Sequence, residues 1–337
     1  MNLWRLTLTL FLTGRVLLAG GERIPGYASQ SIAPPADAGY VRPDGAIRIV
    51  CGNRGMGRIL EGFGDLFSRT HPGVRFAIEY NRLGNAVNLP ALTHGVTLVG
   101  PMGREATPVE LVPYRKIVGA DPLIFRIAHG TVVARDKAAP LAIYVNQANP
   151  LERLTVAQVA RIFTSGATGG DLTTWGQLGL TGEWASRAIH PCGTPEASGF
   201  GAYMQLHRMD GRAFAPGYES FPLAAQIVKR VGEDPGAIGF SALGFQTPQT
   251  RIIAVAERPE GPFLTGTVEE IASGNYAYDR FIYLYVRRVP GQPLDPFVRE
   301  YLRLVLSTEG RRIIAAEPDG FIPLNDREAA AELAKLD

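Results

Sequence analysis

The sequence predicts an α/β fold built as two lobes, on two observations. Strand-like and helix-like patterns alternate along most of the 337 residues, which is typical of α/β proteins. The two cysteines, Cys51 and Cys192, stand in matching contexts: each ends a short apolar run, and a glycine-rich turn and an apolar pattern at helical spacing follow. Such strand–turn–helix units direct backbone N–H groups toward anions. Two of them, about 140 residues apart, suggest two lobes that each present one such turn.

Composition limits the classes of protein that the chain can belong to. Hydrophobic residues make up 46% and charged residues 20%, the usual balance of a globular protein, and the length fits two domains. A formal net charge of +2 argues against a nucleic-acid partner, which requires a concentrated basic face. Beyond the N-terminus, no apolar segment is long enough to span a bilayer, so we do not expect a membrane-spanning protein.

The N-terminus has the features of an export signal. Over residues 1–21, Arg5 precedes an apolar stretch that ends in small residues. Arg15 interrupts the stretch, so a disordered or amphipathic start is the alternative. Gly21 stands where a lipoprotein would carry cysteine, so we expect a freely soluble periplasmic or secreted product. Residues 22–44, rich in Pro, Ala and Gly, predict a loosely ordered lead-in.

Periodicity places the regular elements along the chain. Strands are predicted from Ala46 to Cys51, and at Val74–Tyr80, Val96–Val99, Pro122–Ala128, Leu141–Val145, Ile238–Phe240 and Phe281–Val286. Helices are predicted after each Cys-Gly turn, after a Thr155 cap, from Pro296 to Leu306, and in an alanine-rich C-terminal segment.

Several short motifs carry a resemblance to a known family. They are Ile143–Asn146, Asn149–Leu151, Thr174–Gly179, Gly182–Trp184, Ala237–Ser241, Tyr278–Tyr283 and Leu306–Gly310. Their order and spacing resemble the substrate-binding protein of the bacterial phosphate ABC transporter, within the type II periplasmic binding proteins. The resemblance covers roughly residues 46 to 324.

The resemblance implies two α/β lobes joined by two hinge strands, with the ligand held in the cleft between the lobes. It places the hinges near Leu141–Val145 and Phe281–Val286. Lobe one is then 45–142 plus 282–330, and lobe two is 143–281. It further implies a monomeric binding protein without enzymatic activity or cofactor. The expected ligand is phosphate or a related oxyanion, and a possible partner is an ABC transporter permease.

The ligand-holding motifs depart from those of the family. Relatives read Gly-Ser-Asp-Thr-Met in the first turn, where this chain has 52–56 as Gly-Asn-Arg-Gly-Met. The second loop, 84–92, lacks the Ser and Thr of its relatives, and Pro101–Arg104 replaces the serine of Pro-Met-Ser-Arg with Gly103. In the fourth motif, Gly-Arg-Asn-x-x-Ser-Gly-Thr, Thr194 takes the arginine position and Phe200 the final threonine position.

These motifs imply a set of ligand-binding positions. The positions are Asn53, Arg54, Gly55, Met56, Asn85, Gly103, Arg104, Thr194, Ser198, Gly199 and Phe200. A desolvated phosphate is held by hydroxyls, backbone N–H groups and a bidentate guanidinium, and several of these are lost here. Arg104 and Ser198 remain, and Arg54 compensates only if it points inward rather than to solvent. The alternative function is therefore a degenerate relative that acts as a sensor, scaffold or partner-binding protein without binding phosphate.

The cysteines and their neighbours allow other hypotheses. His190 lies two residues before Cys192, but a metal site needs three or four converging ligands and a Cys–His nucleophile needs a third orienting group. We therefore expect no metal and no catalysis. Cys51 and Cys192 could form a bridge across the cleft if their Cα atoms lie within about 4.4–6.8 Å, but two independent buried thiols are favoured. Trp175 and Trp184 are interpreted as packing residues.

Overall fold

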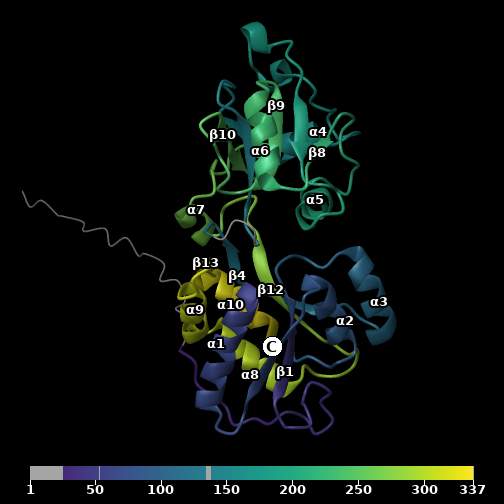
Figure 1. Cartoon of the computed structure of the whole chain (residues 1–337), viewed down its shortest axis with the longest axis vertical. Coiled ribbons are helices and arrows are strands. Elements are labelled where there is room, and N and C mark those ends of the chain that lie inside the picture. Colours follow the sequence, from purple (N-terminus) through teal and green to yellow (C-terminus); the bar gives the residue numbers. More distant parts are fainter. Residues whose placement is uncertain (1–25, 53, 134–137, 337) are drawn as a thin grey trace, which may run out of the picture.

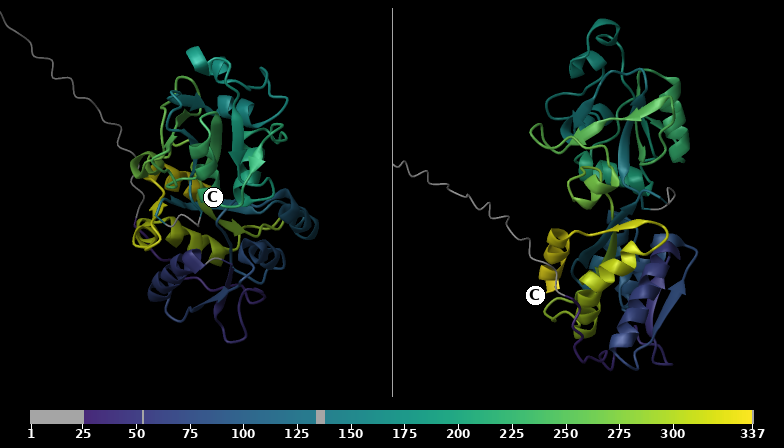
Figure 2. Two further views of the ribbon diagram at one scale, coloured as in Figure 1. Left: turned by 45° about the horizontal axis from the view of Figure 1, so that its top comes forward. Right: turned by 90° about the vertical axis from the view of Figure 1, so that its left-hand side faces the viewer.

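The computed structural model describes residues 26–52, 54–133 and 138–336. Its elements form two lobes, stacked along the long axis and joined by a narrow waist (Figure 1; Figure 2, right). The signal peptide predicted over 1–21 lies outside the described residues. Within the described ranges, no helix combines the length and the apolar character needed to cross a membrane.

Lobe one contains a four-stranded sheet in the order β13-β4-β12-β3 and a parallel β1-β2 pair. Its helices pack on these strands because their apolar stripes face inward; Phe63 and Phe67 of α1 pack against Tyr301 of α8. The elements are β1 (Ile47–Cys51), α1 (Arg54–Thr70), β2 (Phe76–Tyr80), α2 (Asn88–Thr93), β3 (Gly100–Met102), α3 (Pro108–Val118), β4 (Leu123–Thr131), β12 (Phe281–Val286), α8 (Pro296–Leu306), α9 (Thr308–Ala315), β13 (Phe321–Pro323) and α10 (Asp326–Leu333).

Lobe two contains a five-stranded sheet in the order β10-β5-β9-β7-β8 and a short parallel β11-β6 pair. Every residue of β5 and β9 is buried, which explains their near-continuous apolar sequences. The elements are β5 (Leu141–Asn146), β6 (Arg153–Thr155), α4 (Val156–Phe163), β7 (His190–Gly193), α5 (Gly199–Tyr203) continued by a π-helical turn (Met204–Arg208), β8 (Glu219–Ser220), α6 (Ala224–Glu233), β9 (Ala237–Ala242), β10 (Thr250–Ile252), β11 (Ala254–Ala256) and α7 (Val268–Ala272).

The chain passes between the lobes twice, and the two crossings lie side by side. The first crossing joins β4 to β5, and the second runs into β12. The strand ends on either side of the first crossing are hydrogen-bonded to the second crossing: the Gly130 N–H of β4 donates to the carbonyl of Arg280 at 2.6 Å, and the Leu141 N–H of β5 donates to that of Tyr278 at 2.9 Å. Each crossing thus ends where a predicted hinge begins. β5 itself belongs to the sheet of lobe two and β12 to the sheet of lobe one.

The lead-in is more closely packed than its composition predicts. Residues 26–44 contain no helix and only an isolated bridge at Val41, yet their polar groups are anchored on lobe one. The Tyr27 hydroxyl donates to buried Glu300 at 2.6 Å, and the Tyr40 hydroxyl donates to Asp295 at 2.7 Å. These long-range bonds depend on α8, so local composition alone does not reveal them.

Most predicted elements are present with small shifts. The helix predicted at Pro296–Leu306 is α8 itself, and Thr155 caps α4 in a reciprocal capping box with Gln158. The strand predicted at Val96–Val99 is wrong: β3 begins at Gly100, because pairing with β12 determines where the strand forms. The helix after the second Cys-Gly turn has five α-helical residues before it becomes π-helical.

The two cysteines are separate buried thiols, as favoured above. Cys51 lies in the core of lobe one and Cys192 in that of lobe two, and neither forms a disulfide. Burial raises the pKa of Cys192 to about 12, so its thiol stays protonated near neutral pH. Trp175 and Trp184 pack edge to face at 6.3 Å in lobe two, which confirms their interpretation as packing residues.

Replacing Tyr27 with Phe should lower the free energy of unfolding by about 1.5–3 kcal/mol, the range for a hydrogen bond to a charged group. The reason is that Glu300 is 3% exposed and loses its Tyr27 donor. Tyr80→Phe is the matched control, because the Tyr80 hydroxyl makes a 2.7 Å bond to Glu61 at the surface. Its expected change is within about 0.5 kcal/mol. Urea denaturation measures both, and equal losses would contradict the anchoring role of the lead-in.

Candidate functional site

Three loops of lobe one meet at its upper end, where the candidate ligand motifs lie. Gly52, after β1, approaches the second loop so closely that a Cβ there would lie 1.7 Å from the carbonyl oxygen of Gly84. The Gly52 N–H donates to the side-chain oxygen of Asn88 at 3.1 Å. This position therefore requires glycine, and its backbone donor is already occupied.

Asparagine side chains from the second loop also hold the third loop. The amide nitrogen of Asn88 donates to the carbonyl of Pro101, and the Gly103 N–H donates to the Asn85 side chain at 3.3 Å. Asn85 and Gly103, both predicted as ligand-binding positions, thus contact each other. The backbone N–H groups of Gly52 and Gly103 therefore already have side-chain acceptors within lobe one.

Arg104 is bound to a carboxylate of its own lobe. Its two terminal nitrogens donate to the two carboxylate oxygens of Glu110, each at 2.8 Å, in the bidentate geometry of strong ion pairs. Glu110 also accepts the Thr107 N–H in the capping box that begins α3. Burial opposes its charge, but Arg104 and Thr107 together lower the pKa of Glu110 below its usual range, and this pair raises the pKa of Arg104.

Arg104 is also the predicted residue that reaches the opposite lobe. A Cβ on Gly199 would lie 3.1 Å from Cδ of Arg104, so the arginine packs against the start of α5. Ser198 caps this helix by accepting the Gly201 N–H at 3.0 Å. Residues 104–107 and 199–207 enclose about 10 Å³ between them, which is about the room needed by one water molecule.

The two substituted positions of the fourth motif differ in their surroundings. Thr194 is 5% exposed, and its buried hydroxyl has no hydrogen-bond partner among the described residues. Its carbonyl accepts the Tyr218 hydroxyl at 2.7 Å. Phe200 is half-buried, and its ring centre lies 5.4 Å from the guanidinium carbon of Arg280.

The first turn leads directly into α1, which contains the predicted ligand-binding positions Gly55 and Met56. Asn53 and the side chain of Arg54 lie outside the described residues. Gly55 and Met56 are buried in the first turn of α1, with Met56 packed in the core of lobe one. The structure thus joins Asn85 to Gly103 and Arg104 to Gly199, while the ligand role of every predicted position stays a prediction.

Sequence reasoning missed Arg280, a buried charge at the waist. Its side chain is 2% exposed and pairs through one terminal nitrogen with Glu105 at 2.9 Å. Its guanidinium carbon lies 4.3 Å from the ring centre of Tyr203 in α5. The buried Nε and Nη1 find no acceptor in the described part of the chain, and an unmatched buried donor costs about 1–3 kcal/mol. Two sequence signals point to it: Arg280 lies within the family motif Tyr278–Tyr283, and it directly precedes the apolar run that forms β12.

A second buried charge cluster lies on the other side of the waist. Nδ1 of His129 in β4 lies 2.5 Å from Asp279 in the second crossing, and its Nε2 lies 3.0 Å from Glu328 of α10. Burial alone would lower the pKa of His129, but the hydrogen bond to Asp279 and the charges of Asp279 and Glu328 raise it to about 9. The imidazolium is therefore a structural charge near neutral pH.

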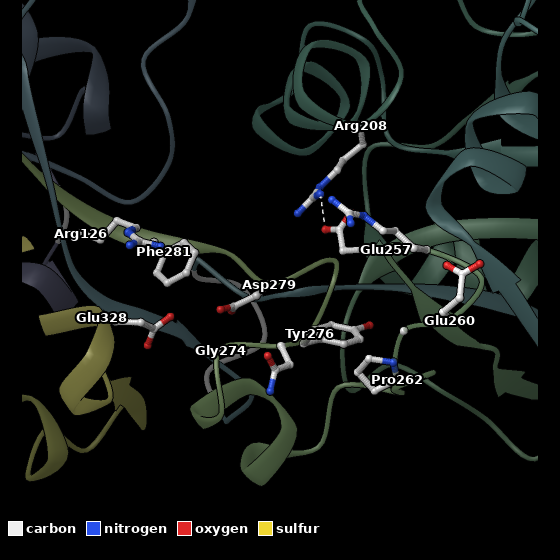
Figure 3. Close-up of a pocket in the computed structure, with 13 residues that line it drawn as sticks. Arg126, Arg208, Glu257, Glu260, Pro262, Gly274, Tyr276, Asp279, Phe281 and Glu328 are labelled. Atoms are coloured by element: carbon white, nitrogen blue, oxygen red, sulfur yellow. Dashed lines mark hydrogen bonds and ion pairs between the residues drawn. The ribbon is translucent and has the colours of Figure 1, made fainter. Parts of the chain in front are cut away.

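This cluster borders a cavity of about 570 Å³ between the lobes on the hinge side (Figure 3). Lobe one supplies Arg126, Phe281 and Glu328, and most of the remaining wall belongs to lobe two. Figure 3 shows Arg208 from above pointing toward Glu257, with which it pairs at 2.7 Å. The wall carries three arginines and four carboxylates, so the cavity does not single out one sign of ligand charge.

The metal and hydrolase hypotheses find no support at His190. Its half-exposed ring pairs with Asp234 at 2.7 Å, whereas Cys192 points into the core of lobe two. Across the residues that the structure describes, no three His, Cys, Asp or Glu side chains are grouped so that they could hold a metal ion.

Two α/β lobes joined by paired crossings, with candidate ligand loops facing each other from both lobes, define a two-lobed solute-binding protein. Residues 59–309 match the PBP superfamily domain. The chain is 31% identical over 288 residues to the phosphate-binding protein PstS of Pseudomonas aeruginosa, covering 85% of each chain.

Solved structures agree on the fold. PstS from Borrelia burgdorferi superposes with a TM-score of 0.54 at 15% identity, covering 82% of this chain and 99% of that chain. An ABC-type phosphate transport receptor from Vibrio cholerae gives 0.52 at 20% identity, with the same two coverages. The chain belongs to the PstS family of the PBP superfamily, and its fold is the two-lobed type II periplasmic binding protein fold predicted from sequence.

The folded protein should lose stability as the pH rises from about 6.5 to 9, because His129 binds its proton more tightly in the folded state than in the unfolded state. The contribution is complete below pH 6.5 and disappears above 9, with a size of about 3 kcal/mol. Asp279 and Glu328 face the ring directly, and Arg126 lies beyond Glu328. Urea denaturation at pH 6 and pH 9.5 measures the difference.

His129→Gln should remove most of this pH dependence. His190→Gln is the control, since that histidine makes a comparable pair with Asp234 but is 48% exposed. An unchanged dependence in His129→Gln would contradict the assignment to the buried cluster.

Proposed function

We propose that this protein is an exported, non-enzymatic solute-binding protein that holds phosphate or a related oxyanion between its lobes. The observation that carries the proposal is the position of Arg104, which extends from lobe one to Gly199 at the start of α5 in lobe two. A guanidinium at this position can contact a ligand that touches both lobes. Membership of the PstS family supports phosphate as the first ligand to test.

The proposed ligand-binding positions are those implied by the family motifs. Arg104 and Ser198 supply charge and hydroxyl, and Asn85, Gly103, Thr194 and Gly199 lie on the same loops. The remaining positions are Asn53, Arg54, Gly55, Met56 and Phe200. An anion at these positions has to exchange hydrogen bonds with groups that are now paired internally, above all with Glu110 on Arg104.

Ligand exchange in this proposal requires the lobes to move apart. The space between residues 104–107 and 199–207 is about 10 Å³, too small for a tetrahedral oxyanion. The moving parts are 45–142 with 282–330 on one side and 143–281 on the other, except that Leu141 and Ala142 belong with β5 in lobe two and Phe281 with β12 in lobe one. The paired crossings act as the hinge. A closed cleft would desolvate the ligand and strengthen its contacts with charged groups.

The cellular setting follows the same reasoning. The apolar N-terminal segment over 1–21 supports export to the periplasm or secretion, and the PstS family supports an ABC transporter permease as the partner. We propose that the mature protein works as a monomer, since one chain supplies both walls of the cleft.

Arg104→Ala should weaken phosphate binding by about 10- to 100-fold, the factor that corresponds to one charge-assisted hydrogen bond. Isothermal titration calorimetry with phosphate, arsenate and sulfate measures it. Arg115→Ala is the matched control: Arg115 is another arginine of the α3 region, paired with Asp121 at 2.6 Å but at the surface. A folded wild-type protein that binds none of the three oxyanions would overturn the proposal and favour a sensor, scaffold or partner-binding role.

A further inference from the structure

Arg280 has the unmet hydrogen-bonding capacity of a ligand-binding guanidinium. A guanidinium carries five N–H donors, and only Nη2 of Arg280 has a partner. The donors on Nε and Nη1 are buried and unmatched among the described residues. Buried donors are normally satisfied, so Nε and Nη1 require an acceptor that the described residues do not supply.

The group that pairs with Arg280 in this structure is itself an anion, the carboxylate of Glu105. Glu105 presents one carboxylate oxygen to Arg280 at 2.9 Å and the other to the Tyr283 hydroxyl at 2.7 Å. Its side chain is 20% exposed, against 2% for Arg280. The carboxylate can therefore turn toward solvent, whereas the guanidinium is fixed by the hinge and by the ring of Tyr203.

The ion pair lies beside the candidate site. Glu105 follows Arg104 directly and, with Arg104, Gly199 and Tyr203, lines the small space between the lobes. The ring of Phe200, the residue that replaces the last threonine of the fourth motif, lies 5.4 Å from the Arg280 guanidinium. Two arginines and a competing carboxylate thus meet where lobe one touches α5.

We propose that Arg280 is an oxyanion-binding residue of the cleft and that Glu105 is a resident competitor that the ligand displaces. This inference rests on the proposed function and deepens it. The guanidinium that relatives carry at the position of Thr194 is then supplied from the second crossing. The Arg280 carbonyl accepts the Gly130 N–H of β4, next to the first crossing, so the same residue connects the ligand to the hinge.

Glu105→Gln tests the competition directly. The amide keeps the shape of the side chain and one accepting oxygen but removes the charge that competes with the ligand. Phosphate should bind about tenfold more tightly than to the wild type, which corresponds to about 1.4 kcal/mol. Glu61→Gln is the matched control, because Glu61 also accepts a tyrosine hydroxyl at 2.7 Å and its replacement changes the net charge equally. It should leave the affinity unchanged.

Arg280→Gln tests the guanidinium itself. It should weaken phosphate binding at least tenfold, while Arg208→Gln changes the affinity little. Arg208 also lies near the Tyr203 ring, at 5.7 Å, but it faces the hinge-side cavity, so it controls for disturbance of α5. Thermal denaturation shows whether each variant folds, and Glu105→Gln keeps the proposal testable if Arg280→Gln does not.

The outcomes separate this inference from the proposed function. A wild type that binds phosphate, with Glu105→Gln no tighter or folded Arg280→Gln unchanged, overturns the role of Arg280 and leaves the proposed function standing. If the wild type does not bind phosphate but the Glu105→Gln variant does, the result supports the competition by Glu105 and overturns phosphate binding by the natural chain. If neither the wild type nor the Glu105→Gln variant binds phosphate, arsenate or sulfate, the role of Arg280 and the proposed function are both overturned.

Discussion

The structure depends on two adjacent buried charges in the second crossing, Asp279 and Arg280. Although they are adjacent, these two side chains have different partners: Asp279 pairs with His129 of β4, and Arg280 pairs with Glu105 beside the candidate site. Both also touch lobe two through Tyr203, whose hydroxyl donates to the Asp279 carbonyl and whose ring lies near the Arg280 guanidinium. One dipeptide thus contacts both lobes on both sides of the waist.

This arrangement makes the relative position of the lobes sensitive to ionic partners. Removing one member of a buried pair leaves an uncompensated charge, which is far more costly than losing an exposed pair. His129, Asp279 and Glu328 link β4, the second crossing and α10, and Asn325 at the start of α10 donates to the Ala272 carbonyl of α7 in lobe two. When the lobes move, these contacts have to be kept or exchanged together. This favours a few discrete relative positions of the lobes over a continuous range of positions.

The fold was largely predictable from sequence, and the site only in part. Periodicity and capping are local, so α8 and the Thr155 cap were predicted well, whereas β3 was misplaced because its position depends on pairing with β12. The order of the family motifs brought Arg104 and Gly199 to one cleft, and the structure has them in contact. The partner of Arg104 was not foreseen. Thr107 and Glu110 form a capping-box pattern that is visible in sequence. The pattern does not reveal that Glu110 also binds Arg104 through both carboxylate oxygens, because that contact forms only in the folded structure.

Arg280 was missed for a more general reason. A single arginine in a sequence is most often a solvated surface charge, and neither the Tyr278–Tyr283 motif nor the apolar run after Arg280 shows that its side chain is 2% exposed. The ion pairs of Arg104 and Arg280 also explain why membership of the PstS family does not by itself determine the ligand affinity of this chain. Two arginines and two glutamates already neutralise one another where the lobes meet, through the Arg104–Glu110 and Arg280–Glu105 pairs. In the proposed site an oxyanion enters by exchange of ion pairs, and its affinity is the difference between two sets of strong interactions. The fold and the hinge can persist while substitutions of the carboxylates shift that difference in either direction.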